Sequence, residues 1–99
     1  MVKLSTNSYI DALNDVLKSR FPANTFSLNG YQECSTCMQF MDGNWVIFDG
    51  ERGNRYDEIY CDTILQACLA FIRRMTHRKD DISAMENELN ENISAEKIA

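Results

Sequence analysis

A chain of 99 residues with 44% hydrophobic side chains has the size and apolar content of one domain with one core, and is too apolar for a disordered chain. Its formal net charge of −5 argues against a general nucleic-acid binder, and no stretch approaches the roughly 20 apolar residues of a membrane helix. Residues 1–16 contain no continuous apolar run of the kind found in secretion signals, which predicts a cytoplasmic protein whose four cysteines are reduced.

The charge is unevenly distributed along the chain. Residues 33–72 carry seven acids against Arg52 and Arg55, whereas residues 73–79 carry four basic and no acidic side chains. Residues 80–99 carry six acids against one lysine, and their charge of −5 equals that of the whole chain. The acidic middle block favours a basic partner, because complementary fields accelerate association.

The first predicted element is an amphipathic helix over residues 5–20, with Pro22 just past its end. Its apolar positions recur at helical spacing: Tyr9, Ile10, Leu13, Val16 and Leu17. Residues 25–31 alternate between apolar and polar side chains, which predicts a short strand. A turn near Asn29 and Gly30 would join that strand to the next one as a hairpin.

Residues 34–41 and 44–49 are predicted to form a hairpin around Asp42 and Gly43, because type I′ turns need positive φ at both central positions. The turn sets a register that runs from Met41 opposite Asn44 to Cys37 opposite Phe48. Side chains alternate across a strand, so each face can be read from this register. The apolar face, expected to pack on the helices, comprises Met38, Phe40, Trp45 and Ile47. The opposite, mixed face comprises Cys37, Gln39, Met41, Val46 and Phe48.

Residues 49–55 are predicted to form a polar loop, and residues 56–61 a further strand. A second helix is predicted to begin at Asp62 and Thr63, since Thr63 and Gln66 have the spacing of a capping box. Its apolar stripe is expected to be buried: Leu65, Cys68, Leu69, Ile72 and Met75, widened by Ile64, Ala67 and Phe71. The tail has a thin apolar stripe, which predicts either a third helix over the mixed sheet face or a frayed segment.

This order of elements predicts an α+β fold, with an antiparallel sheet of three to four strands and helices packed on one face, a two-layer sandwich. Residues 1–79 would form the single domain. Residues 80–99 would form an acidic C-terminal segment, helical or partly disordered.

Two features could carry chemistry, and neither fits a catalytic or metal site. Cys34 and Cys37 have the Cys-x-x-Cys spacing of redox motifs and zinc half-sites. Residues three apart on a strand point to opposite faces, however, and the other two cysteines lie on different elements. His77 is the single histidine, and it lies in the basic run 73–79 with no marked nucleophile. We therefore expect no enzyme activity, no cofactor and no metal.

The charged segments allow functional and purely structural interpretations. The basic run 73–79 could contact RNA, but it also suits a solvated helix C-terminus and lacks interleaved aromatic residues for base stacking. The middle acids lack the tight spacing of a calcium loop and fall at predicted turns. They form either a solvated edge or a partner-binding surface: Asp42, Asp49, Glu51, Asp57, Glu58 and Asp62.

The segment from Trp45 to Asp57, followed by Asp62 and residues 67–71, resembles small bacterial immunity proteins of polymorphic toxin systems, including contact-dependent growth inhibition. The shared features are an aromatic strand, a Glu-Arg-Gly loop, a Tyr-Asp strand and a closing helix with an Ala-Cys pair. The resemblance covers about residues 44–75, a third of the chain. It implies a cytoplasmic, toxin-antitoxin-like inhibitor that binds one cognate toxin domain, often a basic nuclease, and blocks its active site or substrate surface.

The resemblance implies contacts through the acids of the turns and the loop, with Arg52 and Tyr56 as anchors, because Arg and Tyr are enriched at hot spots. The full set is Asp42, Asp49, Glu51, Arg52, Tyr56, Asp57 and Glu58. Glu51 and Arg52 could equally pair with each other to hold the loop.

Two other functions stay open at this point. One is a small adaptor or homodimerising subunit without a catalytic role, which would use the mixed face of Cys37, Val46 and Phe48. The other is a nucleic-acid-binding regulator acting through residues 73–79, which the overall charge disfavours. We expect neither a membrane nor direct nucleic acid as a partner.

Overall fold

The computed structural model describes residues 6–98 of the chain, and the side chains of residues 8–94. Residues 1–5 of the predicted domain 1–79, and residue 99 of the predicted segment 80–99, lie outside the described residues. The fold is α+β, with one helix before a four-stranded sheet and two helices after it. The helices are α1 (Thr6–Lys18), α2 (Ile64–Met75) and α3 (Lys79–Ile98). The strands, in spatial order, are β1 (Phe26–Ser27), β2 (Ser35–Met41), β3 (Asn44–Glu51) and β4 (Asn54–Cys61), and a short 3-10 turn, η1 (Ala23–Thr25), leads into β1.

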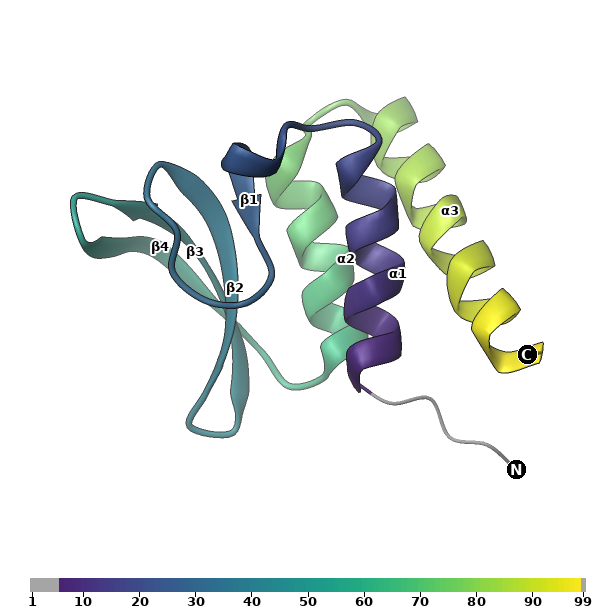
Figure 1. The fold of residues 1–99 in the computed structure, drawn as a ribbon, viewed down its shortest axis with the longest axis horizontal. Coiled ribbons are helices and arrows are strands. Elements are labelled where there is room, and N and C mark those ends of the chain that lie inside the picture. Colours follow the sequence, from purple (N-terminus) through teal and green to yellow (C-terminus); the bar gives the residue numbers. More distant parts are fainter. Residues whose placement is uncertain (1–5, 99) are drawn as a thin grey trace.

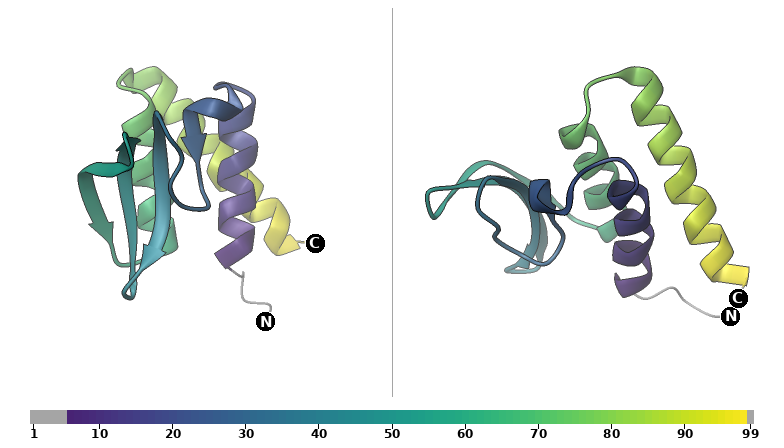
Figure 2. Two further views of the ribbon diagram at one scale, coloured as in Figure 1. Left: turned by 60° about the vertical axis from the view of Figure 1, so that its left-hand side comes forward. Right: turned by 45° about the horizontal axis from the view of Figure 1, so that its top comes forward.

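All three helices lie on one side of the sheet (Figures 1 and 2). Helix α2 packs on β2, β3 and β4, helix α1 packs beside α2, and α3 contacts both α1 and α2 from outside. The predicted position of the tail over the mixed sheet face is therefore wrong. The buried residues of α3, which are Met85, Leu89 and Ile93, belong to the main core instead. Within the described part of the chain, no helix has the length and apolarity to cross a membrane.

Two antiparallel hairpins, each closed by a two-residue turn, form most of the sheet. The predicted turn at Asp42 and Gly43 has φ values of 51° and 83°, and the predicted register from Met41–Asn44 to Cys37–Phe48 is confirmed. The second turn consists of Arg52 and Gly53, with φ values of 54° and 78°. The predicted polar loop over residues 49–55 is wrong, because β3 continues to Glu51 and β4 begins at Asn54.

Strand β1 makes the sheet mixed, so the prediction of a purely antiparallel sheet is wrong. Phe26 and Ser27 pair in parallel with Thr36 and Cys37. After β1 the chain continues in the same direction to Gly30, whose N–H donates to the carbonyl of Met38 (3.0 Å). Residues 31–34 then turn back to the start of β2, so no hairpin forms at this place.

The two faces of the sheet are buried in different ways. Met38 and Ile47 face the helices and are fully buried in the main core, as predicted. Phe40 was expected beside them, but it is 56% exposed because the β2–β3 turn extends beyond the helices (Figure 1). On the opposite face, Cys37, Val46 and Phe48 form a second, fully buried cluster. The ring of Tyr31 stacks on that of Phe48, with centroids 6.4 Å apart, so the segment 28–34 covers this face.

Candidate partner-binding surface

Strand β4 is an edge of the sheet that is open to solvent along almost its whole length. Its one neighbour in the sheet is β3, and every residue of β4 except Cys61 is exposed. Tyr56, Ile59 and Tyr60 are 44%, 43% and 61% exposed. An edge strand with unpaired backbone groups and large apolar side chains is a ready template for another chain. We therefore regard β4 and its surroundings as the candidate partner-binding surface.

A β-bulge in the middle of β4 determines which side chains face the helices. Asp57 and Glu58 lie between the pairs Tyr56–Asp49 and Ile59–Ile47, opposite a single residue of β3. Asp57 has φ of 54°, a left-handed conformation that Asp tolerates better than most residues. Residues three apart on a regular strand point to opposite faces, but the extra residue places Tyr56 and Ile59 on the same face. Both therefore lie on the α2 side of the sheet.

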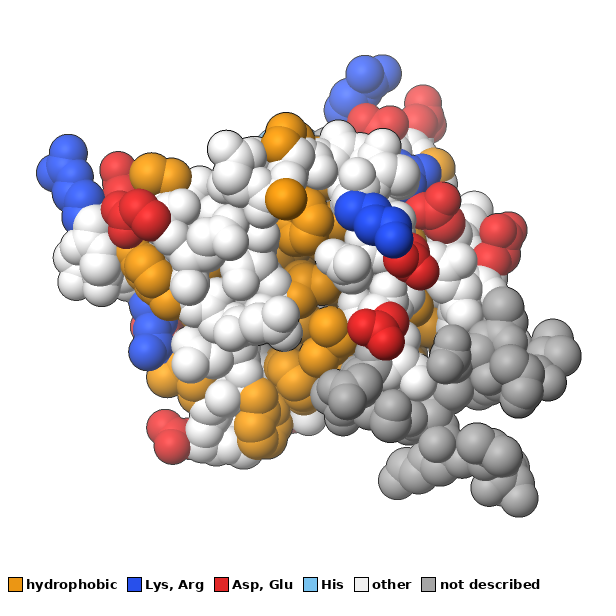
Figure 3. Space-filling model, viewed as in Figure 1, with side chains coloured by type: hydrophobic (Ala, Val, Ile, Leu, Met, Phe, Trp, Pro, Cys, Tyr) orange, Lys and Arg blue, Asp and Glu red, His pale blue; other side chains and the backbone are white. Residues whose placement is uncertain are grey.

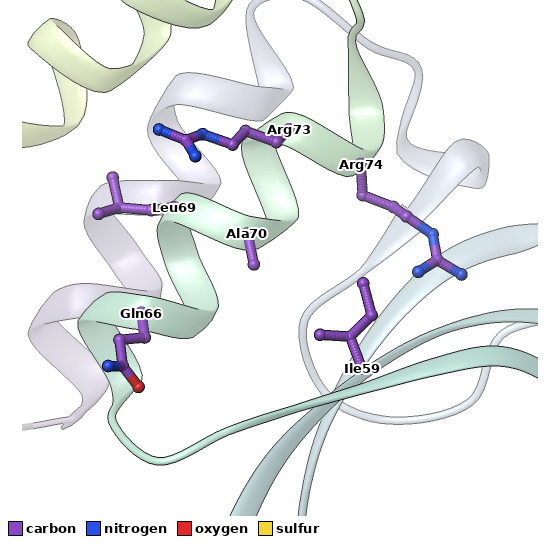
Figure 4. Close-up of a pocket in the computed structure, with 6 residues that line it drawn as sticks. All are labelled: Ile59, Gln66, Leu69, Ala70, Arg73 and Arg74. Atoms are coloured by element: carbon purple, nitrogen blue, oxygen red, sulfur yellow. The ribbon is translucent and has the colours of Figure 1, made fainter.

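A groove of about 430 Å³ lies between β4 and α2. Figure 4 shows Ile59 extending from β4 toward α2, on the side where Ala70 points back toward the strand. The remaining lining residues come from successive turns of α2: Gln66, Leu69, Arg73 and Arg74. The walls near Ile59, Leu69 and Ala70 are apolar, and the two arginines lie at one end.

Both arginines at the groove are paired with acids of the chain itself. Arg74 forms an ion pair with Asp49 (3.1 Å) and donates a hydrogen bond to the carbonyl of Tyr56 (3.3 Å). Arg73 forms an ion pair with Glu86 of α3 (3.3 Å). The positive charges of both arginines are therefore largely compensated within the molecule. The contacts of Arg74 also connect the C-terminal end of α2 to the β3–β4 hairpin.

The structure brings six of the seven sequence-predicted contact residues onto one hairpin. These six lie on β3, β4 or the turn between them: Asp49, Glu51, Arg52, Tyr56, Asp57 and Glu58. Asp42 lies in the β2–β3 turn, at the opposite end of β3 from the β3–β4 turn. Asp42 is therefore not on the β3–β4 hairpin, and the ion pair of Asp49 with Arg74 gives Asp49 a structural role.

The acids on the outside of the hairpin have few partners. No ion pair involves Glu51 or Asp57 in the described part of the chain, and Glu58 contacts Arg55 only at 4.0 Å. The suggested pair of Glu51 with Arg52 does not form. Figure 3 shows acidic and basic side chains next to each other at the left end of the molecule, where Figure 1 places the β3–β4 turn. The hairpin thus presents arginines and uncompensated acids together.

The β3–β4 turn is held by two side chains that the sequence interpretation did not include. The carboxylate of Glu33 accepts hydrogen bonds from the backbone N–H groups of Arg52 (2.5 Å) and Gly53 (3.2 Å). The hydroxyl of Tyr31 donates to Glu33 and accepts from the Gly53 N–H (2.7 Å). The hydrogen bond from Tyr31, followed by those from the turn, lowers the pKa of Glu33. These contacts fix the turn against the segment 28–34.

The groove residues were also missed as a site, for an identifiable reason. The alternation of residues 56–61 predicts a strand there, but not that this strand is an edge. Helical spacing assigned Leu65 and Leu69 to the buried stripe of α2. The prediction is confirmed for Ala67, Cys68, Phe71 and Ile72, which are fully buried, but Leu69 is half-buried and Leu65 is 39% exposed.

The thiols and the histidine are not arranged together. Cys34 is exposed and lies before β2 with φ of 56°, whereas Cys37 is buried in the second cluster, and all four cysteines are free. Burial raises the pKa values of Cys37 and Cys61, and that of Cys68 to about 12. His77 is exposed between α2 and α3. Across the described residues there is no group of three or more His, Cys, Asp or Glu side chains that could hold a metal ion.

Comparisons of the chain with protein-family models, curated proteins and solved structures found no match. A function is therefore inferred from the surface of the chain, and the open edge of β4 is the strongest feature of that surface.

Proposed function

We propose that this chain is an immunity protein that binds a cognate toxin domain, of the basic nuclease class, and neutralises it by stoichiometric protein–protein contact. The observation that carries the proposal is the open edge of β4, with Tyr56, Ile59 and Tyr60 exposed beside acids. The resemblance of residues 44–75 to immunity proteins supplies the class of partner. The proposed role needs no catalysis and no cofactor, and it is exercised in the cytoplasm.

The charges of the hairpin support a basic partner. Glu51 and Asp57 have no ion partner among the described residues, so their charge is directed to solvent. Nuclease domains carry cations that hold phosphates, and an acidic inhibitor associates quickly with such a surface. Arg52 and Tyr56 supply the residue types that contribute most to interface hot spots.

The adaptor or homodimer alternative loses the surface on which it was based. Cys37, Val46 and Phe48 are fully buried beneath the segment 28–34, so they do not form a face that a second subunit could contact.

The alternative of a nucleic-acid-binding regulator is weakened too. Three of the four cations of the basic run form ion pairs within the chain: Arg73, Arg74 and Arg78.

The proposal is tested by affinity capture from the native host at moderate salt, with the bound proteins identified by mass. We expect a single, near-stoichiometric basic domain whose purified activity the chain inhibits at a 1:1 ratio. The double variant Asp57→Asn with Glu58→Gln should bind this domain more slowly, because two exposed acids of β4 are removed while residue 57 keeps a side chain tolerant of positive φ.

The matched control is the double variant Asp11→Asn with Glu91→Gln, which removes the same charge from exposed positions of α1 and α3. It should bind at the wild-type rate. Recovery of the chain alone, or of nucleic acid, would contradict the proposal, and so would equal slowing in both double variants.

A further inference from the structure

We propose that β4 takes up an extended segment of the partner as a fifth strand, and that the groove beside Ile59 receives an apolar side chain of that segment. This inference rests on the proposed function, and it names the part of the toxin domain that binds: a strand with alternating apolar and basic side chains. Addition of a strand to an exposed sheet edge is a general mode of peptide recognition, in which backbone hydrogen bonds give affinity and pockets give specificity.

The position of the groove fits this mode. A strand paired with β4 would lie about 4.8 Å from it, and every second side chain would point to the α2 side of the sheet. That side is where the groove opens, with Ile59 on the strand and Leu69 and Ala70 on the helix (Figure 4). An apolar side chain of the added strand would therefore cover three apolar side chains that are now partly open to solvent.

The bulge in β4 enlarges the apolar side of this surface. Because Asp57 and Glu58 together oppose one residue of β3, Tyr56 and Ile59 both face the α2 side. On the other side of the strand, the hydroxyl of Tyr60 lies 3.5 Å from the carboxylate of Glu58. The added strand would meet apolar groups on one side and, on the other, Glu58, which Arg55 contacts only at 4.0 Å, and this favours a segment in which apolar and basic residues alternate.

Charge favours a basic partner over a second copy of the chain. Antiparallel pairing of two β4 strands about a twofold axis would bring the adjacent acids Asp57 and Glu58 of both copies together in the middle of the interface. Like charges that face each other across strands are destabilising. The cations at the groove do not offset this repulsion, because Arg73 and Arg74 are already paired with Glu86 and Asp49. A strand that carries Lys or Arg would compensate the acids instead.

The test uses a library of random twelve-residue linear peptides displayed on phage and selected against the full chain. We expect enrichment of peptides in which apolar and basic residues alternate. A synthetic peptide of the enriched sequence should protect amides of β4 from hydrogen exchange and should shift the resonances of Ile59 and Ala70.

Two variants with the same substitution separate binding in the groove from other effects. Ala70→Trp fills the groove and should weaken binding of the synthetic peptide at least tenfold. Ala84→Trp adds the same side chain at an exposed position of α3 and should leave binding unchanged. Circular dichroism and the unfolding midpoint of each variant verify that both are folded.

Enrichment without the alternating pattern, or equal binding to Ala70→Trp and wild type, would overturn the inference. A wild-type dimer in sedimentation that Ala70→Trp dissociates would also overturn it, by identifying a second copy as the occupant. If a captured toxin domain is inhibited equally by Ala70→Trp and wild type, the strand addition fails while the proposed function stands. If patterned peptides bind at β4 but no toxin domain is captured, the edge site is supported and the toxin assignment fails.

Discussion

Glu33 connects two segments of the chain that are far apart in the sequence. Its carboxylate binds the backbone N–H groups of Arg52 and Gly53, nineteen and twenty residues away, and accepts the hydroxyl proton of Tyr31. All three donors favour the ionised carboxylate, so the pKa of Glu33 lies below its usual value. The β3–β4 turn is thus held in place by a charged group whose protonation state can be changed experimentally.

We predict that Glu33→Gln lowers the urea midpoint at pH 7 and that its difference from wild type narrows in acid. The pKa of Glu33 is lower in the folded than in the unfolded chain. Its contribution is therefore present above the unfolded pKa and is lost as pH falls through the folded pKa. Glu91→Gln on α3 serves as the control. A difference that is the same at pH 7 and pH 3 would contradict this role.

The four cysteines differ in exposure, which predicts their reactivity. Cys34 is exposed, whereas burial of the other three raises their pKa values, so they remain protonated at neutral pH. We expect an aromatic disulfide reagent to modify one thiol rapidly in the native protein and all four in urea. Cys34→Ser should abolish the rapid phase. Rapid modification of Cys68 in the native protein would contradict its burial in the main core.

Helix α2 begins with the capping box that its sequence predicts. The Gln66 N–H donates to the Thr63 hydroxyl (3.1 Å), and the Thr63 N–H donates to the Gln66 side-chain oxygen (3.4 Å). We predict that Thr63→Ala lowers the free energy of unfolding by about 1 kcal/mol, as measured by urea denaturation. Ser83→Ala, at an exposed position inside α3, should leave the stability equal or slightly higher. Equal losses in both variants would contradict the role of the cap.

The elements that the sequence predicts well are those specified by local chemistry. Asp42-Gly43 is a strong type I′ signal, so the first hairpin and its register could be derived from the sequence. Arg52-Gly53 adopts the same conformation without Asn or Asp at the first position, so its turn was predicted as a loop. Strand β1 has two residues, too few for any pattern to indicate its direction.

At the scale of the whole molecule, the acidic tail becomes part of the core. Leu89 of α3 is fully buried among residues of α1 and α2, and Arg20 forms an ion pair with Glu88 (2.7 Å). We predict that Leu89→Ala lowers the free energy of unfolding by about 2–5 kcal/mol, a large part of the roughly 5–15 kcal/mol of a typical domain. Asn90→Ala, on the exposed side of the same helix, is the control. A change below about 1 kcal/mol for Leu89→Ala would mean that α3 is not docked.

The candidate site was predictable only where it is local in sequence. Glu51, Arg52, Tyr56 and Asp57 lie within seven residues, so one hairpin brings them together. The groove joins Ile59 to Ala70 across two elements, and its existence depends on β4 being an edge strand that α2 covers incompletely. Neither alternation nor helical spacing contains that information, because both describe one element at a time.

The second apolar cluster has a consequence for the order in which parts of the protein unfold. Cys37, Val46 and Phe48 are covered by the segment 28–34 and by Arg55, whose guanidinium carbon lies 5.4 Å from the centre of the Phe48 ring, and not by a helix. Leu28 belongs to the main core, but residues 29–34 do not, so we expect residues 29–34 to detach in a sub-global unfolding event that precedes global unfolding. The Cys37 thiol would become accessible in that event while Cys68 stays protected. Because Glu33 lies in this segment, the same event should release the β3–β4 turn.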